Sequence, residues 1–256
     1  MSSTDIESLL SSFVSLSVKD NDKDINKALK IQRWFRGSIV RLKRLPLIMY
    51  KIQKHLHDST IDFSNDNEDG RINSCIDEDT VIKILIEKFK DRIKKPKIRM
   101  WYDILVFDQI HGWIPCNIKT TTTETCDNTG NLAMCVYAYT DVVLKLDINK
   151  SYENGKMSNL LFEKLNDKKH NKTAKKDYYF IVLNKKKNKD IIVNSVKGIS
   201  ILTANINNLP FQICWSKNRE FKYDKIDNKI KLFIECLQKP RPSWKETFMS
   251  NIRTLT

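Results

Sequence analysis

The chain has 256 residues, of which 41% are hydrophobic, so it can bury one substantial core in a single domain with an extension. Its 45 lysines and arginines outnumber its 31 aspartates and glutamates, and the net charge of +14 suits a polyanionic partner. We find no apolar run near the ~20 residues that span a bilayer and no secretory signal, so we expect an intracellular, cytoplasmic or nuclear protein that does not enter a membrane.

The N-terminal part is predicted to be a lead followed by a basic helix. Residues 1–24 are rich in serine and aspartate and predict a flexible or short-helical lead. Residues 25–57 predict a basic amphipathic helical extension, with Trp34 and Phe35 on its apolar face. Arg36 and Arg41 fall on its basic face, where contact with DNA phosphates would add affinity that does not depend on base sequence.

Within this extension, residues 31–41 read IQRWFRGSIVR, which resembles the IQ motif. That motif binds calmodulin and related light chains as a helix in a groove. Arg44 stands at a usually apolar position of the motif, and Pro46 ends the helix early. Three interpretations stay open: a basic helix that faces DNA and packs on the core, a purely structural helix, and, least favoured, a helix for a calmodulin-type partner.

Residues 58–70 are rich in aspartate and asparagine and predict a linker to a domain over 71–256. Ser74 to Asp77 has the spacing of a capping box, so a helix is predicted from about Asp77 to Ile93, with residues 69–74 as its entry loop. In that loop Arg71 would meet a phosphate. Glu78 lies on the apolar stripe of the helix, where a carboxylate is costly unless it is paired or binds a metal. A helix-start acid favoured by the dipole is the alternative.

The most informative segment is a predicted hairpin, with strands over 101–107 and 113–121 and a turn at 108–112. If Phe107 faces Trp113, counting outward brings Asp103 opposite Asn117, and Lys119 follows two residues later. Side chains alternate faces along a strand, so these three polar groups share one side of the sheet. The other side carries apolar residues that would pack against helices, namely Ile104, Val106, Ile114 and Ile118.

This arrangement resembles the catalytic core of the PD-(D/E)XK nuclease superfamily, in particular the type II restriction endonucleases. The resemblance implies Asp103 as the main ligand of Mg²⁺ (or Mn²⁺), with Glu78, Asn117 and the Ile118 carbonyl as further ligands. It implies Lys119 as the group that activates the attacking water. Asn117 departs from the pattern, because the family usually has an acid there. The implied function is a metal-dependent endodeoxyribonuclease that hydrolyses double-stranded DNA, and many such enzymes act as homodimers.

The segment after the hairpin is rich in hydroxyl groups, and we expect Thr120 and Thr121 to contact DNA. Asp127-Asn128 is interpreted as the N-cap of a buried helix within 130–139. The loop 216–219 is predicted to recognise DNA through Lys217 and Arg219. The remaining predicted elements are a helix over 157–165, strands over 178–183, 191–196 and 209–215, and helices over 231–238 and 243–252.

Together these elements predict an α/β fold in which a central mixed sheet is flanked by helices, a restriction-endonuclease-like core with an N-terminal basic helical extension. A rival interpretation is a DNA-binding protein of the same fold with a damaged catalytic centre, and another is an IQ-type adaptor. Six cysteines without a C-x-x-C pair, together with four histidines, predict reduced and mostly buried thiols and no zinc site.

Overall fold

The computed structural model describes residues 44–64, 70–97, 100–140, 142–144, 154–166, 176–205 and 210–239. The chain divides into two compact units, Met1–Arg44 and Leu45–Thr256, and the description below concerns the second. The predicted basic face with Arg36 and Arg41, and the predicted helix over 243–252, lie outside the described residues.

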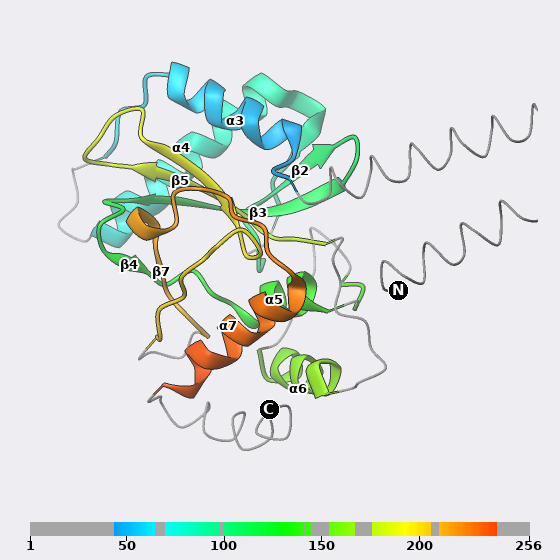
Figure 1. Cartoon of the computed structure of the whole chain (residues 1–256). Coiled ribbons are helices and arrows are strands. Elements are labelled where there is room, and N and C mark those ends of the chain that lie inside the picture. Colours follow the sequence, from blue (N-terminus) through cyan, green and yellow to red (C-terminus); the bar gives the residue numbers. More distant parts are fainter. Residues whose placement is uncertain are drawn as a thin grey trace, which may run out of the picture. The chain divides into compact units, whose positions relative to one another are not determined.

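A five-stranded mixed sheet with the order β1-β2-β3-β5-β6 forms the centre of this unit (Figure 1). All neighbouring strands are antiparallel except β3 and β5, which are parallel. A parallel pair needs a long crossover connection, and the described part of this connection contains two helices. The strands are β1 (Ile93–Lys94), β2 (Ile104–Asp108), β3 (Gly112–Thr121), β5 (Tyr179–Asn184) and β6 (Ile191–Ser195).

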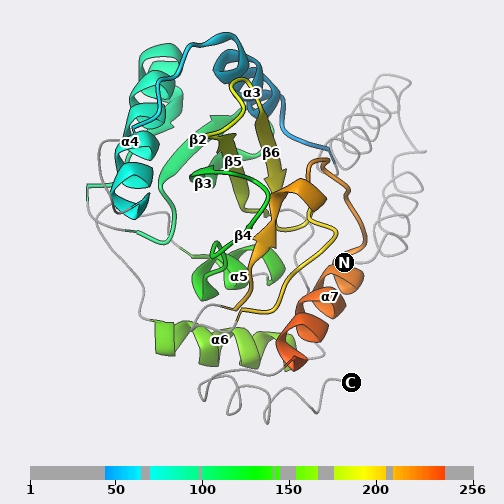
Figure 2. The ribbon, with the colours of Figure 1, turned by 90° about the vertical axis from the view of Figure 1, so that its left-hand side faces the viewer.

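Helices cover both faces of the sheet, so the protein is a mixed α/β fold (Figure 2). One face packs against α3 (Leu47–Asp58) and α4 (Gly70–Phe89). The core on the other face contains residues of α5 (Leu132–Tyr139), α6 (Asn154–Asn166) and α7 (Ile226–Gln238), and α6 packs against α5.

The interior strand β5 contributes to both cores, because all six of its residues are buried. Ile181 belongs to the core under α3 and α4, whereas Phe180 and Val182 belong to the core on the other face. A continuous apolar strand is typical of a sheet covered on both sides. The predicted strands over 178–183 and 191–196 are therefore confirmed as an antiparallel pair.

The hairpin has the register predicted from the sequence. Phe107 pairs with Trp113, and Ile104 pairs with Cys116. The N–H of Asp103 donates to the carbonyl of Cys116 at 2.9 Å, one step beyond the start of β2. The four residues predicted on the apolar side, Ile104, Val106, Ile114 and Ile118, all lie in the core under α3 and α4.

The predicted start of α4 is wrong, because the helix begins at Gly70 and the supposed entry loop is its first turn. Asp77 lies inside the helix and is buried. Its carboxylate accepts a hydrogen bond from the Ser64 N–H at 2.7 Å and lies 2.7 Å from the Lys185 ammonium. Partners from other segments thus satisfy this carboxylate, which the local capping signal could not reveal.

The N-cap of α5 is also not where the sequence suggested. Asn131 caps the helix, and its side-chain oxygen accepts a hydrogen bond from the Met134 N–H at 2.7 Å. Asp127 instead lies in the short strand β4 (Cys126–Asp127), which pairs antiparallel with β7 (Ile213–Cys214). The predicted strand over 209–215 shortens to β7 and is followed by the 3₁₀ turn η2 (Trp215–Lys217).

The compact unit begins upstream of the predicted boundary at residue 71. Pro46 precedes α3, whose buried residues Ile48, Met49 and Ile52 pack into the core with Val81 of α4. Part of the predicted linker is packed as well, since Ile61 is buried in the same core. Residues 45–57 therefore belong structurally to the folded domain rather than to a separate extension.

The helices predicted over 157–165 and 231–238 are confirmed as α6 and α7, each with a longer extent than predicted. Among the residues that the structure describes, no helix is both long and apolar enough to span a membrane.

The hairpin turn is held by Asp108, whose Oδ1 accepts hydrogen bonds from the N–H groups of Ile110 and His111 at 2.9 and 3.1 Å. The His111 Nδ1 lies 2.8 Å from the same oxygen. Burial alone would raise the pKa of Asp108, but these contacts outweigh it and lower the pKa to about 2. The ionised carboxylate therefore stabilises the turn that sets the register.

We predict that Asp108→Asn removes a pH-dependent part of the stability. A carboxylate with a lowered pKa contributes stability above its unfolded-state pKa and loses it as the pH falls toward the folded-state value. The stability advantage of the wild type should fall by about 1 kcal/mol between pH 5 and pH 3 and continue to fall toward pH 2. Urea denaturation across this range measures it, with exposed Asp62→Asn as control. Parallel pH profiles for wild type and Asp108→Asn would contradict the prediction.

Candidate active site

Asp103 directly precedes the first residue of β2 and is held beside β3. Its Oδ2 accepts hydrogen bonds from the Asn117 Nδ2 at 2.7 Å and from the backbone N–H of Ile118 at 2.8 Å. The predicted facing of Asp103 and Asn117 is therefore confirmed. The amide nitrogen of Asn117, rather than its oxygen, points at the carboxylate, and the Asn117 Oδ1 is buried and accepts no hydrogen bond from the described residues.

Glu78 reaches the same region from α4. Its Oε1 accepts a hydrogen bond from the Lys119 Nζ at 3.0 Å, and the two side chains are only 19% and 26% exposed. This contact joins residues 41 positions apart in the chain. Glu78, which the sequence placed on the apolar stripe of the helix, thus lies beside Lys119.

The pKa values describe a coupled group of charges. Burial raises the pKa of Glu78, Lys119 partly offsets this, and the charge of Asp103 raises it further. Burial would lower the pKa of Lys119, but the Glu78 and Asp103 carboxylates outweigh it, so the pKa of Lys119 is raised. Lys119 therefore stays protonated and balances the two acids.

The two carboxylates lie along one edge of β3. Ile104, the first residue of β2, pairs with Cys116, so residues 117–121 of β3 extend beyond β2. The N–H of Ile118 points to this edge and donates to Asp103, while the N–H of Thr120 lies near Glu78 and lowers its pKa. In a strand the N–H and C=O of one residue point to the same side. The Ile118 carbonyl therefore lies on the edge between the groups that serve Asp103 and Glu78.

This edge presents the kind of oxygen atoms that bind a hard divalent cation. Mg²⁺ in proteins is held by one or two carboxylates together with other oxygens and waters. Two carboxylates with a backbone carbonyl between them fit that requirement. In the described part of the chain, no group of three or more His, Cys, Asp or Glu side chains is placed to share one ion, so water would have to complete the ligand set.

A polar pocket of about 450 Å³ opens beside the edge, and Glu78 and Lys119 line it. Asp103 and Asn117 are not among its lining residues. Thr120 and Thr121, predicted to meet DNA, do line it, but their hydroxyls have partners inside the protein. The hydroxyl of Thr120 donates to the Ser74 carbonyl at 3.4 Å and that of Thr121 to the Asp127 Oδ1 at 3.0 Å.

Sequence reasoning missed Asp127, which it assigned to a helix cap. Asp127 lines the pocket, and burial raises its pKa, while Thr121, Trp215 and Lys119 act in the opposite direction. The sequence held one signal against a capping role: Asp127 lies too far before the first residue of α5, whereas Asn131 directly precedes that residue. The structure therefore adds a third carboxylate to the pocket that Glu78 and Lys119 line, and its charge interacts with Lys119.

Lys185 was also missed, although it begins the run Lys185-Lys186-Lys187-Asn188-Lys189 between β5 and β6. Its Nζ lies 2.7 Å from the Asp77 Oδ2 and 3.1 Å from the Ser74 Oγ, which places it in the pocket wall. The next three lysines of this run, Lys186, Lys187 and Lys189, are exposed. A basic loop thus adjoins the pocket.

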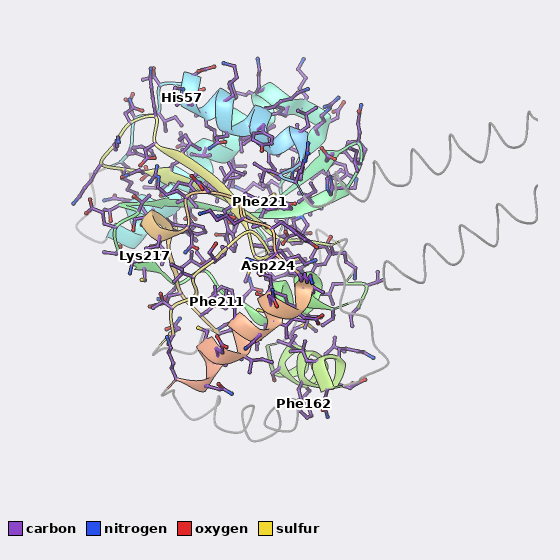
Figure 3. All side chains as sticks on the ribbon, in the orientation of Figure 1. His57, Phe162, Phe211, Lys217, Phe221 and Asp224 are labelled. Carbon is purple, nitrogen blue, oxygen red and sulfur yellow. The ribbon has the colours of Figure 1, made fainter. Side chains whose placement is uncertain are left out.

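The predicted recognition loop lies next to the threonine segment. The Ser216 N–H donates to the Thr123 carbonyl at 3.0 Å, and Lys217 is exposed on η2, near β4 and β7 (Figure 3). Arg219 is exposed and forms an ion pair with Asp190 at the end of the basic loop. The side chain of Arg71 lies outside the described residues.

Comparison with known proteins identifies no relative. No protein-family model, no curated protein and no solved structure matches this chain.

We predict opposite effects of Asn117→Asp on stability and on metal binding. Without metal, the variant places a second carboxylate against Asp103 where an amide now donates, and it should lower the free energy of unfolding by about 1–3 kcal/mol. With Mn²⁺ or Mg²⁺ the added charge should strengthen binding about tenfold, equal to about 1.4 kcal/mol. Urea denaturation in EDTA and calorimetric metal titration measure the two effects.

The control is Asn188→Asp in the exposed β5–β6 turn, which should change neither quantity. Unchanged stability and unchanged metal affinity in Asn117→Asp would mean that residue 117 is not beside a cation site.

Proposed function

We propose that the protein is a divalent-metal-dependent endodeoxyribonuclease with a restriction-endonuclease-like core, similar to the PD-(D/E)XK nucleases, that hydrolyses phosphodiester bonds of double-stranded DNA. The observation that carries the proposal is the convergence of Asp103, Glu78 and Lys119 at the open edge of β3. These groups come from three different segments of the chain. The contact of Glu78 on α4 with Lys119 is not required by the pattern of the hairpin alone.

The order of elements supports the same proposal. A helix that supplies a glutamate, α4, precedes the β2–β3 hairpin. The helix α5 follows, and the next strand of the sheet, β5, lies parallel to the second strand of the hairpin. This is the sequence of helix, hairpin, helix and strand that the resemblance implies for such a core.

In the proposed site, Asp103, Glu78 and the Ile118 carbonyl would hold the ion. A bound Mg²⁺ would lower the pKa of a coordinated water and offset the charge that develops on the phosphate. Lys119 is protonated and is held by Glu78, so its role is to orient the attacking water or to stabilise the developing negative charge. Asn117 restrains Asp103 through its amide.

The distribution of charge supports a polyanionic substrate. The basic loop of Lys186, Lys187 and Lys189 follows Lys185, which lines the pocket. The exposed Lys217 follows Ser216, which is hydrogen-bonded to Thr123, and the exposed Arg219 forms an ion pair with Asp190 at the end of the basic loop. Phosphate contacts of this kind fix the position of a duplex and supply salt-dependent affinity. The substrate backbone would therefore be held on the side of the pocket next to the β5–β6 turn.

The first test is cleavage of supercoiled plasmid DNA with Mg²⁺ or Mn²⁺. We expect Asp103→Ala and Lys119→Met to lower the cleavage rate by about 10²–10⁴-fold, because each removes a group that acts at the reacting phosphate. Glu78→Gln should lower it as well, since the neutral amide binds both the ion and Lys119 more weakly. Gel electrophoresis of the plasmid gives the rate.

The matched controls are Glu87→Gln and Lys83→Met, which change the same residue types on the exposed side of α4 and should leave the rate unchanged. No cleavage by the wild type under any of these conditions, with DNA binding intact, would refute the enzyme and favour the binding protein described below.

A second test concerns the basic loop. Replacing Lys186, Lys187 and Lys189 together with alanine should weaken DNA binding at low salt. It should also reduce the slope of log affinity against log salt by about 2–3, because each phosphate contact releases about 0.9 counterion. Fluorescence anisotropy with a labelled duplex, in Ca²⁺, measures both quantities.

The control for the charge change is the triple alanine variant of the exposed Lys51, Lys83 and Lys88 on α3 and α4. Equal losses of affinity in the two triple variants would show that overall charge, and not this loop, attracts the DNA.

A DNA-binding protein of the same fold without catalytic activity is the second candidate. It is favoured by Asn117, whose amide donates to Asp103 at 2.7 Å where an acid would provide a second charge for the ion. The IQ-type adaptor remains a prediction, because its residues lie outside the described part of the chain.

A further inference from the structure

Two cysteines far apart in the sequence face each other across the small β4–β7 ribbon. Cys126 pairs with Cys214 in the antiparallel register, and the two are 88 residues apart in the chain. Their sulfur atoms are 2.8 Å apart. Opposite residues of antiparallel strands have Cα atoms about 4.5–5.5 Å apart, which lies within the range of about 4.4–6.8 Å found in disulfides. Little backbone movement would be needed to join them.

The two thiols differ in access to solvent. Cys126 is partly exposed, whereas Cys214 is buried and only 7% exposed. The surroundings are polar: the Cys126 thiol lies 3.7 Å from the Thr203 hydroxyl, and the Cys214 thiol lies 3.9 Å from the Glu124 carbonyl. A small oxidant can therefore reach Cys126 first, with Cys214 directly behind it.

The other cysteines lack this combination of accessibility and a paired thiol. Cys116, Cys135 and Cys236 are buried in the two cores, where an oxidant has no access. Cys75 is exposed on α4, and no other thiol of the described residues contacts it. Cys126 and Cys214 thus form a local site that the composition of the chain did not reveal.

We propose that Cys126 and Cys214 form an oxidation-sensitive thiol pair, which a hydroperoxide converts to a disulfide that links β4 to β7. The Cys126 thiolate attacks one peroxide oxygen and becomes a sulfenic acid, and the other oxygen leaves as water or an alcohol after it takes up a proton. The Cys214 sulfur then attacks the sulfenic sulfur, and the hydroxyl group leaves as water. Overall, the two thiols lose two electrons, and these electrons reduce one hydroperoxide.

The bond would act on the wall of the pocket. Asp127 follows Cys126 directly in β4, and its Oδ1 accepts a hydrogen bond from Thr121 at the end of β3. On the other side, η2 follows Cys214 and carries Lys217. A disulfide would therefore tie together the segments that bear Asp127 and Lys217. The proposal concerns the thiols alone and does not depend on the nuclease assignment.

The test uses the reduced full-length protein, treated under native conditions with hydrogen peroxide and then blocked with an alkylating agent. Digestion without reduction should yield a linked pair of peptides containing Cys126 and Cys214, lighter than their sum by two hydrogen atoms. The linked pair should be absent from Cys126→Ser and Cys214→Ser and retained in Cys75→Ser. Circular dichroism verifies that each variant is folded.

A second readout is thermal unfolding. A cross-link over a long loop restricts the unfolded chain, so the oxidised wild type should unfold at a higher temperature than the reduced protein, and Cys214→Ser should show no such shift. The proposal is overturned if peroxide oxidises Cys75 in the wild type while both Cys126 and Cys214 remain open to alkylation. Linkage of either residue to Cys75 instead would overturn it equally.

Discussion

The central constraint in this protein is the edge of β3 over residues 117–121, which extends beyond the first residue of β2. Backbone N–H groups in a protein interior need acceptors, and an incomplete strand pairing leaves such donors without a neighbouring strand. Here carboxylate side chains take the place of a neighbouring strand as hydrogen-bond acceptors. Asp103 accepts a hydrogen bond from the N–H of Ile118, and Glu78 lies near the N–H of Thr120. The need to satisfy this edge therefore brings two carboxylates together.

Two partly buried carboxylates at one edge require a positive charge. Lys119 supplies it, held by Glu78 at 3.0 Å and stabilised as a cation by Asp103 as well. Charges interact more strongly in a half-buried site than in water, which is why the pKa values of Glu78 and Lys119 respond to each other. The same arrangement that satisfies the backbone thus creates a site with defined charges beside a polar pocket.

The sequence could predict the hairpin and its polar face, because alternation along a strand and a turn closed by Gly112 are local signals. Gly112 has φ of 70°, a conformation that favours glycine, and the turn before it fixes the register. Glu78 was predictable for a similar reason, since it falls on the helical period of Val81. Both predictions depend on residues close together in the chain.

The positions and partners of Asp77 and Asp127 could not be predicted, because they depend on segments far away in the chain. Asp77 looked like part of a capping box, but its partners are Ser64 and Lys185, and no local rule connects them. Asp127 looked like a helix cap because Asp is common there, whereas its position depends on pairing with β7, far along the chain. Local propensity is a weak prior where tertiary partners compete for the same side chain.

Asn117 can be understood from this balance of charges. In the protein without a metal, Asp103 and Glu78 at the edge of β3 lie near the ammonium group of Lys119, and Asp127 also interacts with that charge. An acid at position 117 would add a further negative charge 2.7 Å from the Asp103 Oδ2 and would need an ion to hold the site together. The amide instead donates a hydrogen bond to Asp103. Asn117 therefore favours a site that is ordered without a cation, and the same hydrogen bond would weaken the attraction of Asp103 for the proposed cation.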